Sequence, residues 1–247
     1  MSSLHKTRGI ALRVSDYSET SIIARIYTEH FGMQAYMLNG AKRKKSSVKS
    51  NMLQPMTLLE MNVYHKTGKG LQRISEMHCE PKLKTVAFDM SKTSVAFMMS
   101  EVISRTVKES EANKKLFDFI FDAVLQLDTQ PDADNFNLSF LLHLSTFLGF
   151  FPNENFSTAT PYFNLKDGLF RKQPPTHPHW LDIPLSENFY SLITTPLENS
   201  SSLKFSSSAK KNLLSALLMY FRLHVDGFTG IRSQKILEEV WSTEFEL

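Results

Sequence analysis

The stretch TLLEMNVYHKTGKGLQRISEM, residues 57–77, decides how the first third of the chain folds. Residues 57–65 and 71–77 are rich in aliphatic, aromatic and β-branched residues, and the glycine-containing turn 66–70 separates them. Two such runs around a short turn are typical of a β-hairpin. Pro55 precedes the first run, and the entry to a strand is a position where proline is tolerated. We therefore predict two antiparallel strands here.

Working backwards from this hairpin, three more short runs have strand character, over residues 7–14, 21–28 and 32–40. A polar turn separates the first two runs, and the third begins and ends on glycine. No helical spacing interrupts them. Five short strands without an intervening helix indicate a small closed barrel or a sandwich.

After Pro81 the apolar spacing becomes helical. Asn135 is a candidate N-cap for a helix that ends before Gly149 and is apolar almost all round, so we expect it at the domain centre. A proline-rich segment follows, with a predicted hairpin around Lys166-Asp167-Gly168, and then a serine-rich loop that offers another N-cap. The predicted helices cover residues 86–107, 116–125, 136–148, 209–225 and 233–241. We place domains at 1–80 and 81–247, with an insertion at about 151–185.

The charge is divided unevenly along the 247 residues, whose net charge is +3. Residues 1–80 carry twelve Lys and Arg against six Asp and Glu, whereas residues 81–247 carry sixteen against nineteen. A basic first third favours a polyanionic partner, although solubility alone could account for it. The single cysteine, Cys79, excludes an internal disulfide framework and suits a reducing cytoplasm. No apolar run approaches the ~18 residues of a membrane span, and the N-terminus lacks an apolar signal core.

The strongest candidate site is the basic run Lys42-Arg43-Lys44-Lys45, with Lys49 close behind. Adjacent cations repel one another, and phosphates relieve this repulsion while releasing counterions. The alternative is a solvated loop. Arg8, Arg13 and Arg25 on predicted strands extend the basic set. Tyr27, Phe31, Tyr36 and Tyr64 are candidate stacking platforms for bases, or else residues of the core.

Metal sites and catalytic motifs find little support. A structural zinc site needs four ligands, and Cys79 with His177 and His179 does not supply them, so we expect no metal and no cofactor. We interpret His177 and His179 as loop histidines and His143 as a hydrogen-bonded core histidine. The chain has no phosphate-binding glycine loop, no nucleophile elbow and no cluster of carboxylates for Mg²⁺. These absences argue against an enzyme.

Several stretches of the chain resemble the RecO family of recombination mediators. They are residues 5–13, 17–23, 27–32, 39–46, 53–60 and 70–74, together with 220–225 and 227–233 near the end. The resemblance runs nearly end to end, and it is loosest between residues 81 and 150. It implies an α+β multidomain protein: a five-stranded OB-fold β-barrel followed by an all-α helical domain with a small zinc-ribbon-like hairpin insertion. Many members hold zinc there with four cysteines, which this chain lacks.

The resemblance also implies a function. Such proteins bind single- and double-stranded DNA, anneal complementary strands coated with single-strand DNA-binding protein and, with RecR, promote loading of RecA. They act in DNA repair and homologous recombination, in the cytoplasm and at the nucleoid, and not at a membrane. In this resemblance, the C-terminal tail of single-strand DNA-binding protein is acidic and ends in apolar residues.

We therefore predict a non-enzymatic mediator with two kinds of binding residue. The predicted DNA-binding residues are Arg8, Arg13, Arg25, Tyr36, Lys42, Arg43, Lys44, Lys45 and Lys49. An apolar pocket beside cations would bind the tail, and the nearest cations are Arg105, Lys108, Lys114 and Lys115, unless these four serve helix solubility alone. The rival functions are an OB-type RNA-binding factor and a non-catalytic protein-interaction scaffold.

Overall fold

The computed structural model describes residues 3–41, 50–108 and 111–243. Its chain forms two compact units, Met1–Thr129 and Gln130–Leu247. The change from strands to helices falls between Cys79 and Met90, where the sequence places it. The first unit nevertheless extends beyond this change, because it also contains two helices.

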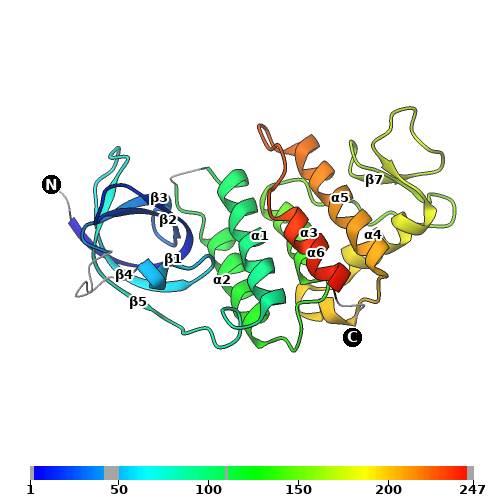
Figure 1. Ribbon diagram of the computed structural model, residues 1–247. Helices are drawn as coiled ribbons and strands as arrows, with labels where there is room; N and C mark the ends of the chain where they lie inside the picture. The colour runs from blue at the N-terminus through cyan, green and yellow to red at the C-terminus, as the bar shows by residue number, and fades with distance from the viewer. Residues whose placement is uncertain (1–2, 42–49, 109–110, 244–247) are drawn as a thin grey trace. The chain divides into compact units, whose positions relative to one another are not determined.

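A closed barrel of five strands, in the order β1-β2-β3-β5-β4, forms the first part of unit 1 (Figure 1). Its strands are β1 (Ser3–Asp16), β2 (Ile22–Thr28), β3 (Gly32–Leu38), β4 (Leu58–His65) and β5 (Gln72–Cys79). All neighbouring strands are antiparallel except β3 and β5. The OB-fold barrel is therefore confirmed and the sandwich alternative is wrong. A short 3₁₀ helix, η1 (Ser50–Leu53), precedes β4.

β1 is longer than predicted because it pairs with β2 along one part and with β4 along another. Gly9 lies where the two pairings overlap. A Cβ atom at Gly9 would lie 2.5 Å from Met61 Cε and 2.8 Å from Ile26 Cγ2. Glycine therefore allows the side chains of β2 and β4 to meet against the backbone of β1.

Two helices, α1 (Met90–Thr106) and α2 (Lys114–Thr129), complete unit 1. Asp89 caps α1 by accepting a hydrogen bond from Lys92 N at 3.1 Å. Ser100 Oγ donates to the carbonyl of Leu12 at 2.6 Å, which fastens α1 to β1. Both helices were predicted from their apolar spacing.

The helices of unit 2 surround α3 (Phe136–Phe147), which packs against α4 (Ile183–Thr194), η2 (Leu197–Ser202) and α5 (Ser207–His224). The central position predicted for α3 is thus confirmed. The last helix is α6 (Gln234–Thr243). α4 was not predicted, although Asp182 caps it and Pro184 lies in its first turn, where proline is favoured.

The predicted cap at Asn135 is wrong in its mechanism. Asn135 lies at the N-cap position with a φ of 58°, but its side chain makes no capping hydrogen bond. Its Nδ2 instead donates to the carbonyl of Leu203 at 3.0 Å. The cap expected from the serine-rich stretch is confirmed at Ser206, whose Oγ accepts from Ala209 N at 3.2 Å.

A small sheet in the order β7-β6-β8 forms the insertion: β6 (Tyr162–Asn164), β7 (Leu169–Arg171) and β8 (Trp180–Leu181). The predicted hairpin around Gly168 is confirmed. The Phe163 ring lies 4.8 Å from that of Phe170 and 4.5 Å from that of Phe189, between ring centroids. Asn155 Nδ2 donates to the carbonyl of Phe170 and Asn155 Oδ1 accepts from the Phe170 N–H, each at 3.0 Å. Aromatic packing and side-chain amides therefore hold this sheet.

Candidate nucleic-acid interface

Arg13 in β1 and Arg25 in β2 lie directly opposite each other across the antiparallel pair, and both are exposed. Like charges at opposing positions repel each other, which reduces stability. A phosphate group between them would remove this repulsion. The structure thus brings together two of the predicted DNA-binding residues, on the outer surface of the barrel.

A groove of about 410 Å³ opens beside Arg25. Its lining includes three cations, Arg25 from β2, Lys69 from the β4–β5 turn and Lys108 from the segment after α1. Among the described residues that line it, none is acidic. A concave surface lined by charge of one sign concentrates counter-charged ligands, so the groove suits an anion.

The β4–β5 turn is held against this groove by a buried glutamine. Gln72 Oε1 accepts from Lys66 N at 3.1 Å, and its Nε2 donates to the carbonyls of Lys66 at 2.8 Å and Lys69 at 2.9 Å. The turn therefore has a defined shape. At Gly68 and Gly70 a Cβ atom would meet no other atom within 4 Å, so open space borders the backbone there.

His65, at the end of β4, gives the groove an aromatic wall. Its ring stacks on Phe31 with the centroids 4.0 Å apart and the planes at 15°. Burial lowers the pKa of His65, and the nearby His5 lowers it further. Its Nδ1 is buried and has no hydrogen-bond partner among the described residues. The ring is thus held in place and favours the neutral form.

Arg8 is engaged within the protein and does not face the groove. Its guanidinium binds Glu29 through two hydrogen bonds of 2.9 Å and Asp118 through one of 3.0 Å. It also lies over the rings of Phe117 and Phe121, 5.1 and 4.7 Å from their centroids. The hydrogen bonds from Arg8 lower the pKa of Glu29 to about 2. Arg8 thus joins the barrel to α2.

The predicted stacking platforms divide into two groups. Tyr36 is 0% exposed and Tyr27 is 1% exposed, so their rings belong to the core of this structure and are closed to a base. Tyr64 is 43% exposed, and Phe31 is partly exposed beside His65. Of the two groups, only Tyr64 and Phe31 are accessible to a ligand.

Comparisons with known proteins account for nearly the whole chain. The family model described as Recombination protein O N terminal matches residues 1–80, and the model described as Recombination protein O C terminal matches residues 87–233. The chain belongs to the RecO family.

Curated relatives agree with this assignment along nearly their full lengths. The DNA repair protein RecO of Azobacteroides pseudotrichonymphae is 31% identical over 239 residues, which cover 96% of this chain and 99% of that protein. Proteins with the same name are 31% identical in Flavobacterium psychrophilum and 29% identical in Bacteroides fragilis, again over 96% of this chain and 99% of each relative. The recognition of this family from the sequence is confirmed.

The basic run of this RecO-family chain lies outside the described residues. Lys42, Arg43, Lys44, Lys45 and Lys49 connect β3 to η1 in the sequence. Their predicted role in DNA binding stays a prediction.

The four cations predicted for partner binding have different surroundings. Arg105 pairs with Glu101 at 2.6 Å, and Lys114 lies 2.7 Å from Asp118 and 3.6 Å from Glu29. Lys108 lines the groove beside Arg25. Lys115 is exposed. None of the four lines the second pocket of unit 1, an apolar one beside η1 and α1.

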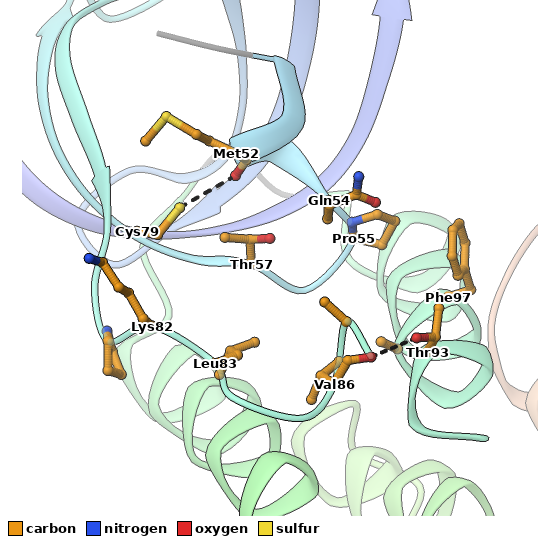
Figure 2. Close-up of a pocket in the computed structure, with 13 residues that line it drawn as sticks. Met52, Gln54, Pro55, Thr57, Cys79, Lys82, Leu83, Val86, Thr93 and Phe97 are labelled. Atoms are coloured by element: carbon orange, nitrogen blue, oxygen red, sulfur yellow. Dashed lines mark hydrogen bonds between the residues drawn. The ribbon is translucent and has the colours of Figure 1, made fainter. Parts of the chain in front are cut away.

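That pocket, of about 530 Å³, lies among η1, the end of β5, the segment after it and α1. Figure 2 shows the Cys79 thiol pointing toward the carbonyl of Met52, and Thr93 toward that of Val86. Its apolar lining includes Leu83 and the half-exposed Phe97, and Lys82 is the one charged residue among the described residues that line it. It combines an apolar surface with a cation, the chemistry expected of a tail-binding site.

Zinc does not fit the insertion of this RecO-family chain. The insertion has no cysteine, and His177 Nδ1 accepts the backbone N–H of His179 at 3.2 Å. Within residues 3–41, 50–108 and 111–243, no three His, Cys, Asp or Glu side chains are grouped to hold a metal ion. In the same residues, no helix is long and apolar enough to cross a membrane.

Sequence reasoning missed three residues of the groove, namely His65, Lys69 and Gln72. Lys69 lies in the turn that was interpreted only as a hairpin signal, and its charge could have been counted with the basic set. Lys82 and Phe97 of the apolar pocket were missed as well. No local motif marks any of them, because the groove and the pocket form only when distant segments meet.

Proposed function

We propose that this chain is a non-enzymatic DNA repair and recombination mediator. In this proposal it binds single- and double-stranded DNA and anneals complementary strands coated with single-strand DNA-binding protein. With RecR, it also promotes loading of RecA. The single observation that carries the proposal is the exposed Arg13–Arg25 pair beside a groove lined by cations. Membership of a family whose curated members are named DNA repair proteins supports it.

A phosphate backbone explains this arrangement better than an acidic protein does. The facing pair Arg13–Arg25, the basic run and every groove residue except Lys108 belong to the first third of the chain, where the charge excess is concentrated. Phosphate attraction needs several separated cations and no particular base sequence. An acidic partner protein would also require an apolar core in the same interface. The proposed DNA surface is therefore the outer face of β1 and β2 with the adjoining groove.

The proposed protein contact lies elsewhere in unit 1. An acidic tail that ends in apolar residues needs a desolvated pocket for its side chains and a cation for its carboxylates. The apolar pocket with Lys82 meets both requirements. Arg105, Lys108, Lys114 and Lys115 remain the alternative proposed from the sequence.

The deciding experiment is annealing of complementary strands, either bare or coated with single-strand DNA-binding protein. We expect the chain to accelerate annealing of both. The double variant Arg13→Gln/Arg25→Gln should lose this activity, and Lys166→Gln/Lys172→Gln, which removes two exposed cations from the insertion, should retain it. Equal activity of the two double variants would contradict the proposed surface.

Two controls separate the rival functions. Heparin should displace DNA, and an RNA single strand of the same sequence should compete less well than DNA. Stronger binding of RNA would favour an RNA-binding factor. If the chain bound neither nucleic acid, a protein-interaction scaffold would be the better interpretation.

A further inference from the structure

Three histidine rings surround the ring of Phe31, next to the groove beside Arg25. His65 from β4 stacks on it with the centroids 4.0 Å apart. His5 from β1 and His30 from the β2–β3 turn approach it edge-on, with the centroids at 5.3 and 6.2 Å. Of the three histidines, His65 is the one that also lines the groove. It therefore connects this histidine cluster to the site proposed for an anion.

The ionisable groups around His65 are almost all cations or histidines. They are Arg25 from β2, His5 from β1, His30 from the β2–β3 turn, Lys66 and Lys69 from the β4–β5 turn, and Lys108 from the segment after α1. The carboxylate of Glu29, beside His30, is bound by Arg8. No acidic residue is among the described residues that line the groove. Without an anion, a proton added to His65 therefore enters positive surroundings.

His65 also differs from the other two histidines in its hydrogen bonds. His30 Nδ1 pairs with the carbonyl of Lys6 at 3.2 Å, and His5 Nε2 pairs with Ser3 Oγ. His65 Nδ1 is buried and has no partner among the described residues. Burial and the nearby His5 lower the pKa of His65. The ring therefore stays neutral near neutral pH until a negative charge comes close.

An anion in the groove reverses this balance. An opposite charge next to an imidazole favours its protonated form. Coupling between two ligands is reciprocal, so a proton on His65 must strengthen anion binding by the same factor by which the anion strengthens proton binding. We propose that the groove binds an anion and a proton together, with His65 as the proton acceptor, so that the chain binds DNA more tightly as the pH falls below neutrality. This inference rests on the proposed function, in which DNA phosphates occupy the groove.

The direction of the effect follows from the two states of His65. Without an anion its pKa lies below the ordinary value of 6.5, and an anion raises it. Between these two pKa values, the complex carries a proton that the free protein lacks. The affinity should therefore rise as the pH falls through this interval and become constant on either side of it. Each unit between the two pKa values is worth a change of about tenfold in affinity.

The test compares the pH dependence of binding in full-length variants that cannot accept a proton at this position. His65→Phe keeps a ring on Phe31, and His65→Asn keeps a polar side chain. The matched control is His78→Phe, because His78 is exposed on β5 and does not line the groove. The affinities for a poly-dT strand and for heparin are measured at about pH 8 and about pH 5.5, which bracket the titration of histidine. Heparin supplies anionic groups without bases.

We expect the affinity of wild type to rise about tenfold more between the two pH values than that of either His65 variant. His78→Phe should follow wild type. Both ligands should behave alike, because charge and not a base attracts the proton. Calorimetry in buffers of different ionisation enthalpy should show that wild type takes up more protons per bound ligand than the two His65 variants do. Melting temperatures at both pH values identify a variant with a damaged fold, and the other variant then decides.

The inference is overturned if wild type takes up no proton on binding, if the His65 variants keep the pH dependence of wild type, or if the effect is confined to poly-dT. Each of these outcomes leaves the proposed DNA-binding function intact. A wild-type chain that bound poly-dT at neither pH would instead contradict the proposed function itself.

Discussion

Thr85 and Asp128 are joined by three hydrogen bonds. Asp128 Oδ1 accepts from Thr85 N at 2.7 Å and from Thr85 Oγ1 at 3.2 Å, and the Asp128 carbonyl accepts from Thr85 Oγ1 at 2.6 Å. The same carboxylate accepts from the backbone N–H groups of Lys84 and Val86. A single side chain at the end of α2 thus holds the segment between β5 and α1.

Replacing Asp128 with Asn should destabilise the protein by about 1–3 kcal/mol, because the amide removes the charge and one acceptor from these hydrogen bonds. Burial opposes ionisation of Asp128, but the hydrogen bonds from Lys84, Thr85 and Val86 outweigh it and lower the pKa. Its contribution to stability is therefore present above pH 3.8, the ordinary pKa, and is lost as the pH falls below it. Urea unfolding at pH 7 and pH 3 measures both effects. A variant as stable as wild type at pH 7 would contradict this role.

Arg8 and Arg13 should behave oppositely although both are cations of β1. Arg8→Gln leaves the partly buried Glu29 without its main hydrogen-bond partner and should cost about 1.5–3 kcal/mol of stability. Arg13→Gln should slightly raise stability, because it removes the repulsion from Arg25, and it should weaken DNA binding, because Arg13 is exposed. Thermal unfolding and a DNA titration, run on both variants, give the comparison. Loss of DNA affinity without loss of stability in Arg8→Gln would support the DNA-binding role predicted for Arg8 from the sequence.

Glu29 should give the protein a second acid-sensitive contribution. Its pKa of about 2 lies below the ordinary value of 4.5, so its pairing stabilises the fold above pH 4.5 and weakens as the pH falls toward 2. Arg8→Gln should remove much of this dependence. The measurement is the free energy of unfolding between pH 7 and pH 2.5 in both proteins, and parallel curves would argue against the coupling.

Changing Lys42, Arg43, Lys44 and Lys45 together to Ala should weaken DNA binding by orders of magnitude. Each lost phosphate contact should also lower the slope of log K against log salt by roughly 0.9 on duplex DNA. Circular dichroism should stay near that of wild type. Unchanged affinity and slope would mean that the run is only a solvated loop.

A peptide copy of an acidic tail that ends in apolar residues should bind the apolar pocket. Phe97→Ala/Lys82→Glu should abolish its binding, because the pair removes an apolar wall and reverses the charge. The matched variant Arg105→Glu/Lys115→Glu tests the site proposed from the sequence. Fluorescence anisotropy of a labelled peptide measures both. If only the second variant loses binding, the helix cations form the site and the pocket does not.

The insertion should be independent of zinc. Elemental analysis of untagged protein should find well below one zinc atom per chain, and a chelator should leave the melting temperature unchanged, because the aromatic rings and Asn155 hold the sheet. By contrast, Phe163→Ala should destabilise the protein by about 3–5 kcal/mol. Stoichiometric, tightly held zinc would show that this interpretation of the insertion is wrong.

Local patterns were enough to predict the five strands, most of the helices and the hairpin around Gly168. Alternation, apolar spacing and turn residues are properties of neighbouring positions, and tertiary packing did not override them here. α4 was missed because the proline-rich segment 151–185, which reaches into its first turn, was interpreted as irregular, although Pro184 lies in a first turn that tolerates proline.

The candidate site was harder to predict from the sequence than the fold was. The charge of Arg8 and the aromatic ring of Tyr36 suggested DNA contacts. The Arg8 guanidinium, however, donates hydrogen bonds to Glu29 and Asp118, and the Tyr36 ring is buried. Whether a side chain faces a partner within the protein depends on residues far away in the chain. Arg13 and Arg25 are brought together only by the register of β1 and β2.

Because α1 and α2 belong to the same compact unit as the barrel, a chimera with a relative should be spliced after Thr129 and not after residue 80. A junction at residue 80 would take Arg8 from one parent and Asp118 from the other, and it would likewise separate Leu12 from Ser100. A junction after Thr129 transfers both sets of contacts whole. The smallest part of this chain that can be exchanged between relatives is thus the barrel with its two helices.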